Sequence, residues 1–402
     1  MATTASRLRD DAKSRGAAKF LICAAAVAIA NLRPTYIGET QSFPVCSILV
    51  FLEALVLFEF YSSNERLSLN TVPALQVMLY ILAVTYMFVR SIFGGFLGDD
   101  DALKAIMISA AYIIAITLAF SVDRYTRAFF DTFAIVIIAS CVSVSITFLL
   151  VTAGAPISAL IIARLPDPPT YSAGFGQVAF PFTHVTNEAL SWFGAAPRLA
   201  GLMREVGCLP PFACWAATYA YLRKWPIYLS VVCLLASLLC LSTIGPLALY
   251  TAAMLVMFKF KIKPLPAALV IIGIAALAWP VIYTMDYIGL EQKINSGSGS
   301  YEDREWLFWA VLDTKDFIFG DGNRWSVVAS GAGINLVSQI RVYGLIFFVP
   351  VIGIYLLALS NLRLWLAACV PALIAVFFSQ PITLDPAFLM IFFSGAALAR
   401  DR

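Results

Sequence analysis

Long runs of apolar residues recur along almost the whole chain and constrain its fold more than any other feature. A helix that crosses a bilayer needs about 20 mostly apolar residues. Hydrophobic residues make up 61% of the 402 residues, whereas soluble domains contain about 45–50%. We therefore predict an all-α polytopic membrane protein, with residues 1–402 as a single integral membrane domain. Twelve apolar runs approach a span in length, at about 18–32, 44–60, 72–92, 102–120, 129–153, 209–222, 226–241, 244–258, 265–283, 342–360, 364–379 and 385–399.

The stretch from 226 to 258 can be read as one long helix or as two short ones, because only residues 242–246 interrupt it. Basic residues stand on both sides of it, at 223–224 and at 259–263. Short cytoplasmic loops of membrane proteins carry an excess of Lys and Arg. Two helices joined by a Gly-Pro turn keep both basic clusters on the cytoplasmic side, so we predict two helices.

The Lys and Arg residues are divided unevenly between the two sides of the membrane. With twelve spans, most of the 27 fall on the side that holds both chain ends, and the positive-inside rule assigns that side to the cytoplasm. The basic first 20 residues precede an apolar run without a clear small-residue cleavage site, which favours an uncleaved first span over a removed signal. We predict a multi-pass protein with both termini cytoplasmic.

Two long polar intervals remain, at about 154–208 and 284–341, and this topology puts both of them outside. Long translocated loops are largely exempt from the charge rule, so their basic residues need another explanation. The second loop contains a Gly/Ser stretch at 296–300 and then a predicted helix that begins after Ser300 and ends near Gly320. Functional residues are expected in these two loops.

The 198–207 segment closes the first long loop and places Arg198, Arg204 and Glu205 around a glycine-containing turn. An arginine on the outer face can reach lipid headgroups, or it can bind an anionic substrate with its planar fork of donors. Because two arginines bracket one turn, both explanations stand. A diphosphate held between two loops would need several such forks. Three arginines of the second loop form a matching set: Arg304, Arg324 and Arg341.

Three ionisable residues have two interpretations each. Glu205 could be a general base for a hydroxyl acceptor, or it could pair with a neighbouring arginine. His184, the single histidine, could act as a base near neutral pH, although its aromatic neighbours favour a packed residue. Glu53 lies in the second apolar run, where ionisable groups are costly and usually functional, but a structural role fits equally well.

No motif for a cofactor, a metal ion or nucleic acid is present. The sequence lacks a P-loop and Cys/His metal spacings, and its only run of acidic residues is at 99–101. The eight cysteines lie almost all in apolar runs without CxxC spacing, which is typical of packing thiols. Outer-loop tryptophans could stack on sugars, but an aromatic belt at the membrane interface explains them as well. They are Trp192, Trp306, Trp309 and Trp325.

The 198–207 segment resembles a signature of O-antigen polymerases, within the O-antigen ligase and polymerase membrane protein family. In that signature an arginine, a Gly-Leu pair and a Glu-Pro-Gly stand before a span. Arg198, Gly201 and Glu205 fill these positions here, and Val206 stands where the family often has proline.

The resemblance extends over about 195–355. Residues 241–249 are similar to the family's Ser/Thr-Gly turn between the next two helices. In the second loop, Arg304, Gly320 and Asn335 are similar to its pattern of an arginine, a Gly-x-Gly and an asparagine. Related O-antigen ligases commonly place a histidine beside such an asparagine. None is present here, which favours a polymerase over a ligase.

The resemblance implies a metal-independent glycosyltransferase of the GT-C type in the bacterial inner membrane. Such an enzyme transfers a growing glycan from undecaprenyl diphosphate to a sugar hydroxyl of a new lipid-linked repeat unit, at the periplasmic face. Donor and acceptor are then both undecaprenyl-diphosphate-linked glycans, and a polysaccharide chain-length regulator is a candidate partner. On this interpretation Glu205 and Arg204 are catalytic. The residues expected to bind the diphosphate are Arg198, Arg304 and Arg341.

Two alternatives stay open. An O-antigen ligase would transfer the glycan to the lipid A core. A flippase for lipid-linked sugars, or another secondary transporter, would form no glycosidic bond. Transporters of this kind bind their substrates near the bilayer midplane, which fits two long outer loops poorly.

Overall fold

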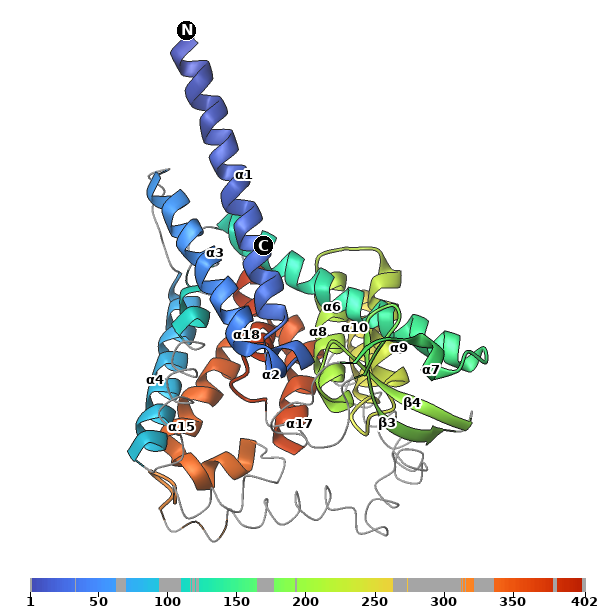
Figure 1. Ribbon diagram of the computed structural model, residues 1–402. Coiled ribbons are helices and arrows are strands. Elements are labelled where there is room, and N and C mark those ends of the chain that lie inside the picture. The colour runs from blue at the N-terminus through green and yellow to red at the C-terminus, as the bar shows by residue number, and fades with distance from the viewer. Residues whose placement is uncertain are drawn as a thin grey trace.

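The structure is a computed structural model of the chain, and most of it is helical (Figure 1). The described residues are 2–32, 34–62, 70–93, 110–115, 117, 120, 123–164, 177–191, 194–262, 273, 312, 314, 316–321, 336–378 and 382–399. The first half contains α1 (Ala2–Ala30), α2 (Tyr36–Thr40), α3 (Ser42–Ser62), α4 (Thr71–Phe93), α6 (Asp123–Thr152), α7 (Ile157–Leu160), β1 (Ile161–Arg164), β2 (Gln177–Ala179), β3 (Thr183–Ser191) and β4 (Gly194–Gly201). The second half contains η1 (Val206–Cys208), α8 (Leu209–Leu222), α9 (Ile227–Leu239), α10 (Leu247–Phe260), α15 (Leu336–Leu357), η4 (Ala358–Ser360), α16 (Leu362–Leu364), η5 (Trp365–Cys369), α17 (Val370–Phe378) and α18 (Pro386–Ala399).

Apolar helices occupy most of the predicted spans. By length and composition, four helices in the described part of the chain could cross a membrane, namely Phe43–Tyr61, Thr71–Arg90, Tyr125–Thr152 and Gln339–Ser360. Shorter apolar helices cover Gly16–Ala30, Ile227–Leu239, Leu247–Phe260, Leu362–Phe377 and Pro386–Gly395. The predicted spans at 102–120 and 265–283 lie largely outside the described residues. A mostly helical protein with candidate membrane spans is therefore confirmed, and the count of twelve stays a prediction.

Two helices, α9 and α10, occupy the stretch that could have been one, as predicted. The hydroxyl of Ser237 donates a hydrogen bond to the carbonyl of Gly245 at 3.1 Å across the intervening turn. A Cβ atom at Gly245 would lie 2.5 Å from the carbonyl oxygen of Ser237. The turn is therefore tight enough to require glycine, and Pro246 directly precedes α10.

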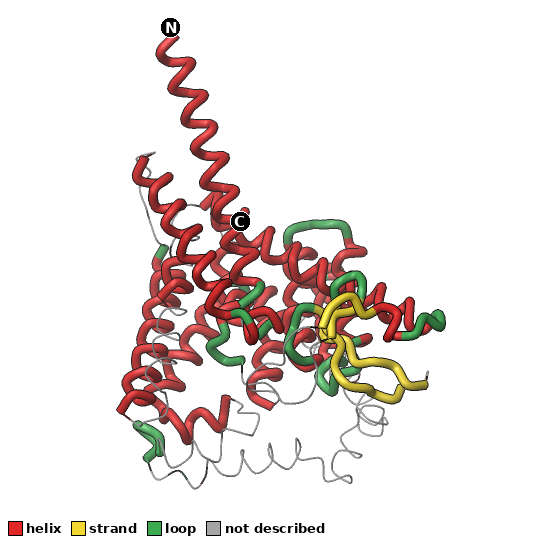
Figure 2. Tube along the Cα trace, viewed as in Figure 1, coloured by secondary structure: helices red, strands yellow, loops and turns green. Residues whose placement is uncertain are grey.

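A four-stranded antiparallel sheet, with strand order β1-β2-β3-β4, lies within the predicted first outer loop. In Figure 2 the strands stand on one flank of the helical body. The prediction of an all-α protein is wrong here. Only segments inside the bilayer must be helical to satisfy their backbone groups. A connection outside it can pair its backbone across short hairpins, as this one does.

The sheet docks on α6 through a polar stripe in an otherwise apolar helix. Ser140, Ser143 and Thr147 are spaced three and four residues apart, which puts them on one helix face. The Ser143 and Thr183 hydroxyls are 2.5 Å apart, and the Thr147 hydroxyl donates to the carbonyl of Phe180 at 2.9 Å. These contacts fix the start of β3 on the helical body.

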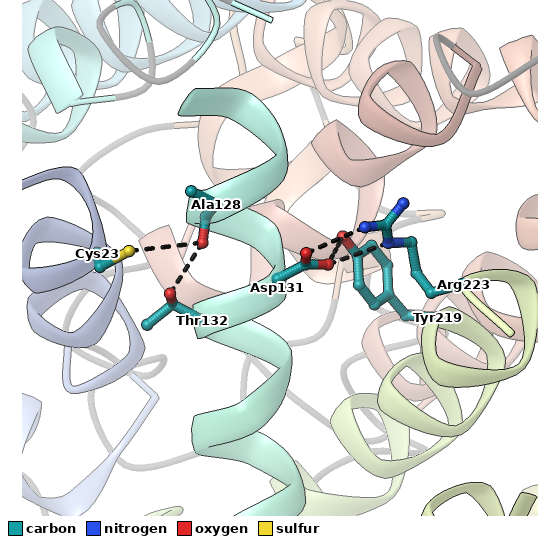
Figure 3. Close-up of polar contacts among 6 residues, drawn as sticks. All are labelled: Cys23, Ala128, Asp131, Thr132, Tyr219 and Arg223. Carbon is teal, nitrogen blue, oxygen red and sulfur yellow. Dashed lines mark hydrogen bonds and ion pairs between the residues drawn. The ribbon is translucent and has the colours of Figure 1, made fainter. Parts of the chain in front are cut away.

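Elsewhere on α6, Asp131 binds two residues from the end of α8 (Figure 3). Arg223 donates from Nε to Oδ1 and from Nη2 to Oδ2, both at 3.1 Å, and the hydroxyl of Tyr219 donates to Oδ1 at 2.9 Å. The two charged side chains are 26% and 17% exposed. This bidentate pair ties α8 to α6 on the predicted cytoplasmic half of both helices.

We expect Asp131→Asn to lower the free energy of unfolding by about 1–3 kcal/mol, because Arg223 then loses a charged acceptor while it stays partly buried. Thr132→Ala is the matched control, since the Thr132 hydroxyl donates only to the carbonyl of Ala128 in its own helix. Thermal unfolding in detergent, followed by tryptophan fluorescence, measures both variants. Equal stability of the two would show that the ion pair contributes nothing.

Candidate active site

Strands β3 and β4 bring the 198–207 segment to the helical body. Arg198 lies on β4 opposite Thr186 of β3, and Gly201 ends β4 opposite His184. The chain then turns into η1 and enters α8, which has proline in its first turn. Proline is favoured there because its missing N–H would have no helical partner. The segment thus runs from a sheet edge into a buried helix.

Gly201 anchors the turn on α6. Its φ is +62°, a left-handed value that favours glycine. A Cβ atom at this position would collide with the hydroxyl oxygen of Ser140. The same oxygen accepts a hydrogen bond from the N–H of Leu202 at 2.9 Å. The glycine in the predicted signature therefore has a physical cause, which is close approach to a helix.

The residues that follow α1 hold the other side of the turn. The N–H of Arg204 donates to the carbonyl of Pro34 at 3.0 Å, and the N–H of Tyr36 donates to the carbonyl of Leu202 at 3.0 Å. The residues between them, Thr35 and Met203, form an antiparallel bridge. The connection between α1 and α3 is thus paired with the 198–207 segment, which the sequence did not indicate.

His184 contacts the turn with its side chain. It is 3% exposed, and its Nδ1 lies 3.2 Å from the carbonyl oxygen of Met203. Its ring packs on Tyr36 with the ring centroids 4.4 Å apart. The interpretation of His184 as a packed residue agrees with this burial, and the hydrogen bond adds a role that packing alone does not supply.

Arg204 and Glu205 lie next to each other at the surface of this turn. Arg204 Nε is 3.9 Å from Glu205 Oε1, with the side chains 12% and 21% exposed. The separation is long for a charge-assisted hydrogen bond, which is usually about 2.7–2.9 Å. The pair is therefore loose, and a carboxylate in such a pair can still accept a proton from a hydroxyl brought beside it.

A second carboxylate joins the site from the end of the chain. The rings of Phe212 and Phe388 have their centroids 6.2 Å apart, so the starts of α8 and α18 pack together. Cys208 directly precedes α8, and Asp385 directly precedes α18. The Asp385 carboxylate is close enough to act electrostatically on the Cys208 thiol, as are Arg204 and Glu205. No motif in the sequence singled out Asp385.

The turn between α9 and α10 lies near β4. The charge of Arg198 acts on the thiol of Cys240, which ends α9. Residues 241–249, which resemble the family's Ser/Thr-Gly turn, directly follow this cysteine. Arg198 is therefore within electrostatic range of the residue that precedes 241–249.

Burial raises the pKa of the Cys208 thiol well above its usual range. The thiolate is the reactive form of cysteine, so its population falls when the pKa rises. We expect no modification of Cys208 by maleimide at pH 7 in the folded protein, and full modification after denaturation. Mass spectrometry of both samples measures this, and rapid labelling of the folded protein would make Cys208 a candidate nucleophile.

Arg341 pairs with Asp321 of its own loop region. Arg341 Nε is 3.5 Å from Asp321 Oδ2, and the N–H of Asp321 donates to the carbonyl of Arg341 at 2.7 Å. In Figure 1, α15, which carries Arg341, and strands β3 and β4 lie on opposite flanks of the helical body. Arg198, Arg204 and Glu205 thus share one segment, whereas Arg341 lies on α15 and pairs with Asp321.

Two glycines allow residues 316–321 to cross α15. Gly320 and Gly344 have φ values of +76° and +72°, and a Cβ atom on either one would collide with backbone atoms of the other segment. The N–H of Leu345 donates to the carbonyl of Phe317 at 2.8 Å, where the helix is kinked. From α4, Arg90 donates to the carbonyl of Gly320 at 2.6 Å. Gly320 is therefore required by a close backbone crossing, and the helix predicted to end near it lies largely outside the described residues.

Several predicted residues lie outside the described part of the chain, including the helix expected after Ser300. Their roles stay predictions. They are Arg304, Arg324, Trp192, Trp306, Trp309 and Trp325. Within the described residues, no group of three or more His, Cys, Asp or Glu side chains could hold a metal ion. Metal independence likewise stays a prediction.

Glu53 is buried inside the helical body, as its position in an apolar run predicts. Its side chain is 3% exposed. An ionisable group in such a place is costly and usually functional in membrane proteins. Glu53 lies on α3, whereas the 198–207 segment runs from β4 into η1.

Comparisons with known protein families, with curated proteins and with solved structures gave no match for this chain.

Proposed function

We propose that this chain is a membrane glycosyltransferase that polymerises undecaprenyl-diphosphate-linked repeat units into O-antigen or a similar surface polysaccharide. One observation carries the proposal. The 198–207 segment, which resembles the O-antigen polymerase signature, is fixed by its backbone on three sides and offers Arg204 and Glu205 at its surface. Preorganised charges of this kind favour a reaction in which negative charge develops.

The roles follow from the charges. Arg198 and Arg204 bind the diphosphate of the donor and stabilise the charge that grows on it as it leaves. The acceptor hydroxyl oxygen forms a bond to the anomeric carbon of the donor, and the bond from that carbon to the diphosphate breaks. The diphosphate keeps the bonding electron pair and departs as undecaprenyl diphosphate. Glu205 takes the hydroxyl proton, as a general base would.

The proposal assigns different roles to Arg304 and Arg341. Arg304 keeps its proposed role in binding diphosphate. Arg341 is paired with Asp321, so its first contribution is to hold residues 316–321, and any contact with diphosphate would require it to leave that pair. Asp385 is a further carboxylate near Cys208.

The proposed topology has twelve spans, both termini in the cytoplasm and the GT-C type of architecture. The active site then faces the periplasm from the inner membrane. The arrangement in Figure 1 supports this, since the start of α1 and the end of α18 lie above strands β3 and β4 in the view. A lipid-linked donor could reach the 198–207 segment from the outer leaflet.

The experiment is polymerisation by the purified protein in liposomes that contain lipid-linked repeat units. We expect a ladder of glycans that increase by one repeat unit, formed without added metal ions. With lipid A core added as a second acceptor, a product only on lipid A core would identify a ligase instead. The buried Glu53 favours a transporter as the second candidate function, and movement of the substrate across the bilayer without any ladder would establish it.

A further inference from the structure

The peptide group between Met203 and Arg204 is held at both ends. Its carbonyl oxygen lies 3.2 Å from Nδ1 of His184, and its N–H donates to the carbonyl of Pro34 at 3.0 Å. A carbonyl oxygen can only accept a hydrogen bond, so Nδ1 of His184 carries the proton. Because this peptide directly precedes Arg204, its orientation sets the direction in which the Arg204 side chain leaves the backbone.

The histidine itself has little freedom to move. It lies in β3, paired with Val178 of β2 on one side and with Gly201 of β4 on the other. Its ring is 3% exposed and packs on Tyr36 at 4.4 Å. The backbone of Tyr36 in turn holds the carbonyl of Leu202. His184 therefore fixes the turn relative to the sheet.

We propose that His184 is a positioning residue of the active site, which orients Arg204 towards the diphosphate of the donor through its hydrogen bond to the Met203 carbonyl. This inference rests on the proposed function. His184 does not touch the reacting atoms in this role. It acts by fixing the peptide group that directly precedes Arg204.

Two substitutions separate the hydrogen bond from the ring packing. His184→Phe keeps a ring against Tyr36 and removes the donor. His184→Asn loses the ring and keeps an N–H donor at the same number of bonds from the backbone as Nδ1. We expect His184→Phe to raise the KM for the lipid-linked donor about tenfold or more, since a displacement of about 1 Å in a binding group can cost that much. We expect His184→Asn to stay within about threefold of wild type.

The KM separates positioning from a purely structural role. A structural role would reduce the amount of folded enzyme and the apparent kcat, while the folded fraction keeps its KM. If His184→Phe keeps the wild-type KM while Arg204→Ala raises it, the inference is wrong and the proposed function stands. If Arg204→Ala polymerises with the wild-type kcat and KM, the role of Arg204 is wrong, and the inference about His184 is wrong with it. If the wild-type protein forms no polymer, the proposed function itself is wrong.

Discussion

Gly344→Ala is expected to destabilise the protein by more than about 3 kcal/mol, or to prevent accumulation of the folded form. Gly344 has a φ of +72°, and its new Cβ atom would collide with the backbone carbonyl of Ile318 and lie 2.5 Å from the backbone nitrogen of Gly320. Backbone atoms on both sides cannot move aside without breaking the hydrogen bond from Leu345 to Phe317. The backbone strain at a positive φ and the collision of the new Cβ atom therefore both destabilise the folded state.

Gly353→Ala on the same helix is the matched control. Its Cβ atom would meet only the side chain of Leu79, with the nearest atom at 2.8 Å, and a leucine can change rotamer. We expect a much smaller loss of stability for this variant. Thermal unfolding in detergent compares the two, and equal unfolding temperatures would contradict the close crossing of residues 316–321 over α15.

Arg204→Ala is expected to lower the rate of polymerisation by about 10²–10³-fold while the protein stays folded, because it removes a positive group aimed at the leaving diphosphate. Arg204→Lys should recover part of the loss, since lysine supplies the charge without the planar fork. Arg304→Ala is expected to act in the same direction. Polymer length and amount in a complementation assay measure these effects, and unchanged polymer in both alanine variants would contradict the assignment.

A double-mutant cycle decides the role of Glu205. If Glu205 is the base, Glu205→Gln is as damaging as Arg204→Ala, and its effect remains when Arg204 is already replaced. If Glu205 only pairs with Arg204, its substitution adds little in the Arg204→Ala background, because contacting residues are not additive. The separation of 3.9 Å between the two side chains makes the first outcome the expected one.

The apolar pattern predicted the helices well because spanning segments must be long and apolar. It also predicted the break between α9 and α10, since Gly245 and Pro246 stand there between two basic clusters. The pattern could not predict the sheet. Strands β1 and β2 have only four and three residues, too short for a visible alternation.

The candidate site was predictable in part. Arg198, Arg204 and Glu205 lie in one short segment of the sequence, and the charges of that segment indicated a site. Tyr36 and Asp385 reach the same region from opposite ends of the chain, and nothing local in the sequence records such a contact. Arg341 matched the predicted set by residue type, but the structure pairs it with Asp321.

The release of undecaprenyl diphosphate by the purified protein tests the central claim most directly. With lipid-linked repeat units as the only substrate, the account predicts one undecaprenyl diphosphate for each glycosidic bond formed, and loss of both products together in Arg204→Ala. Release at the wild-type rate by Arg204→Ala, or disappearance of substrate from one leaflet without any release, would contradict it.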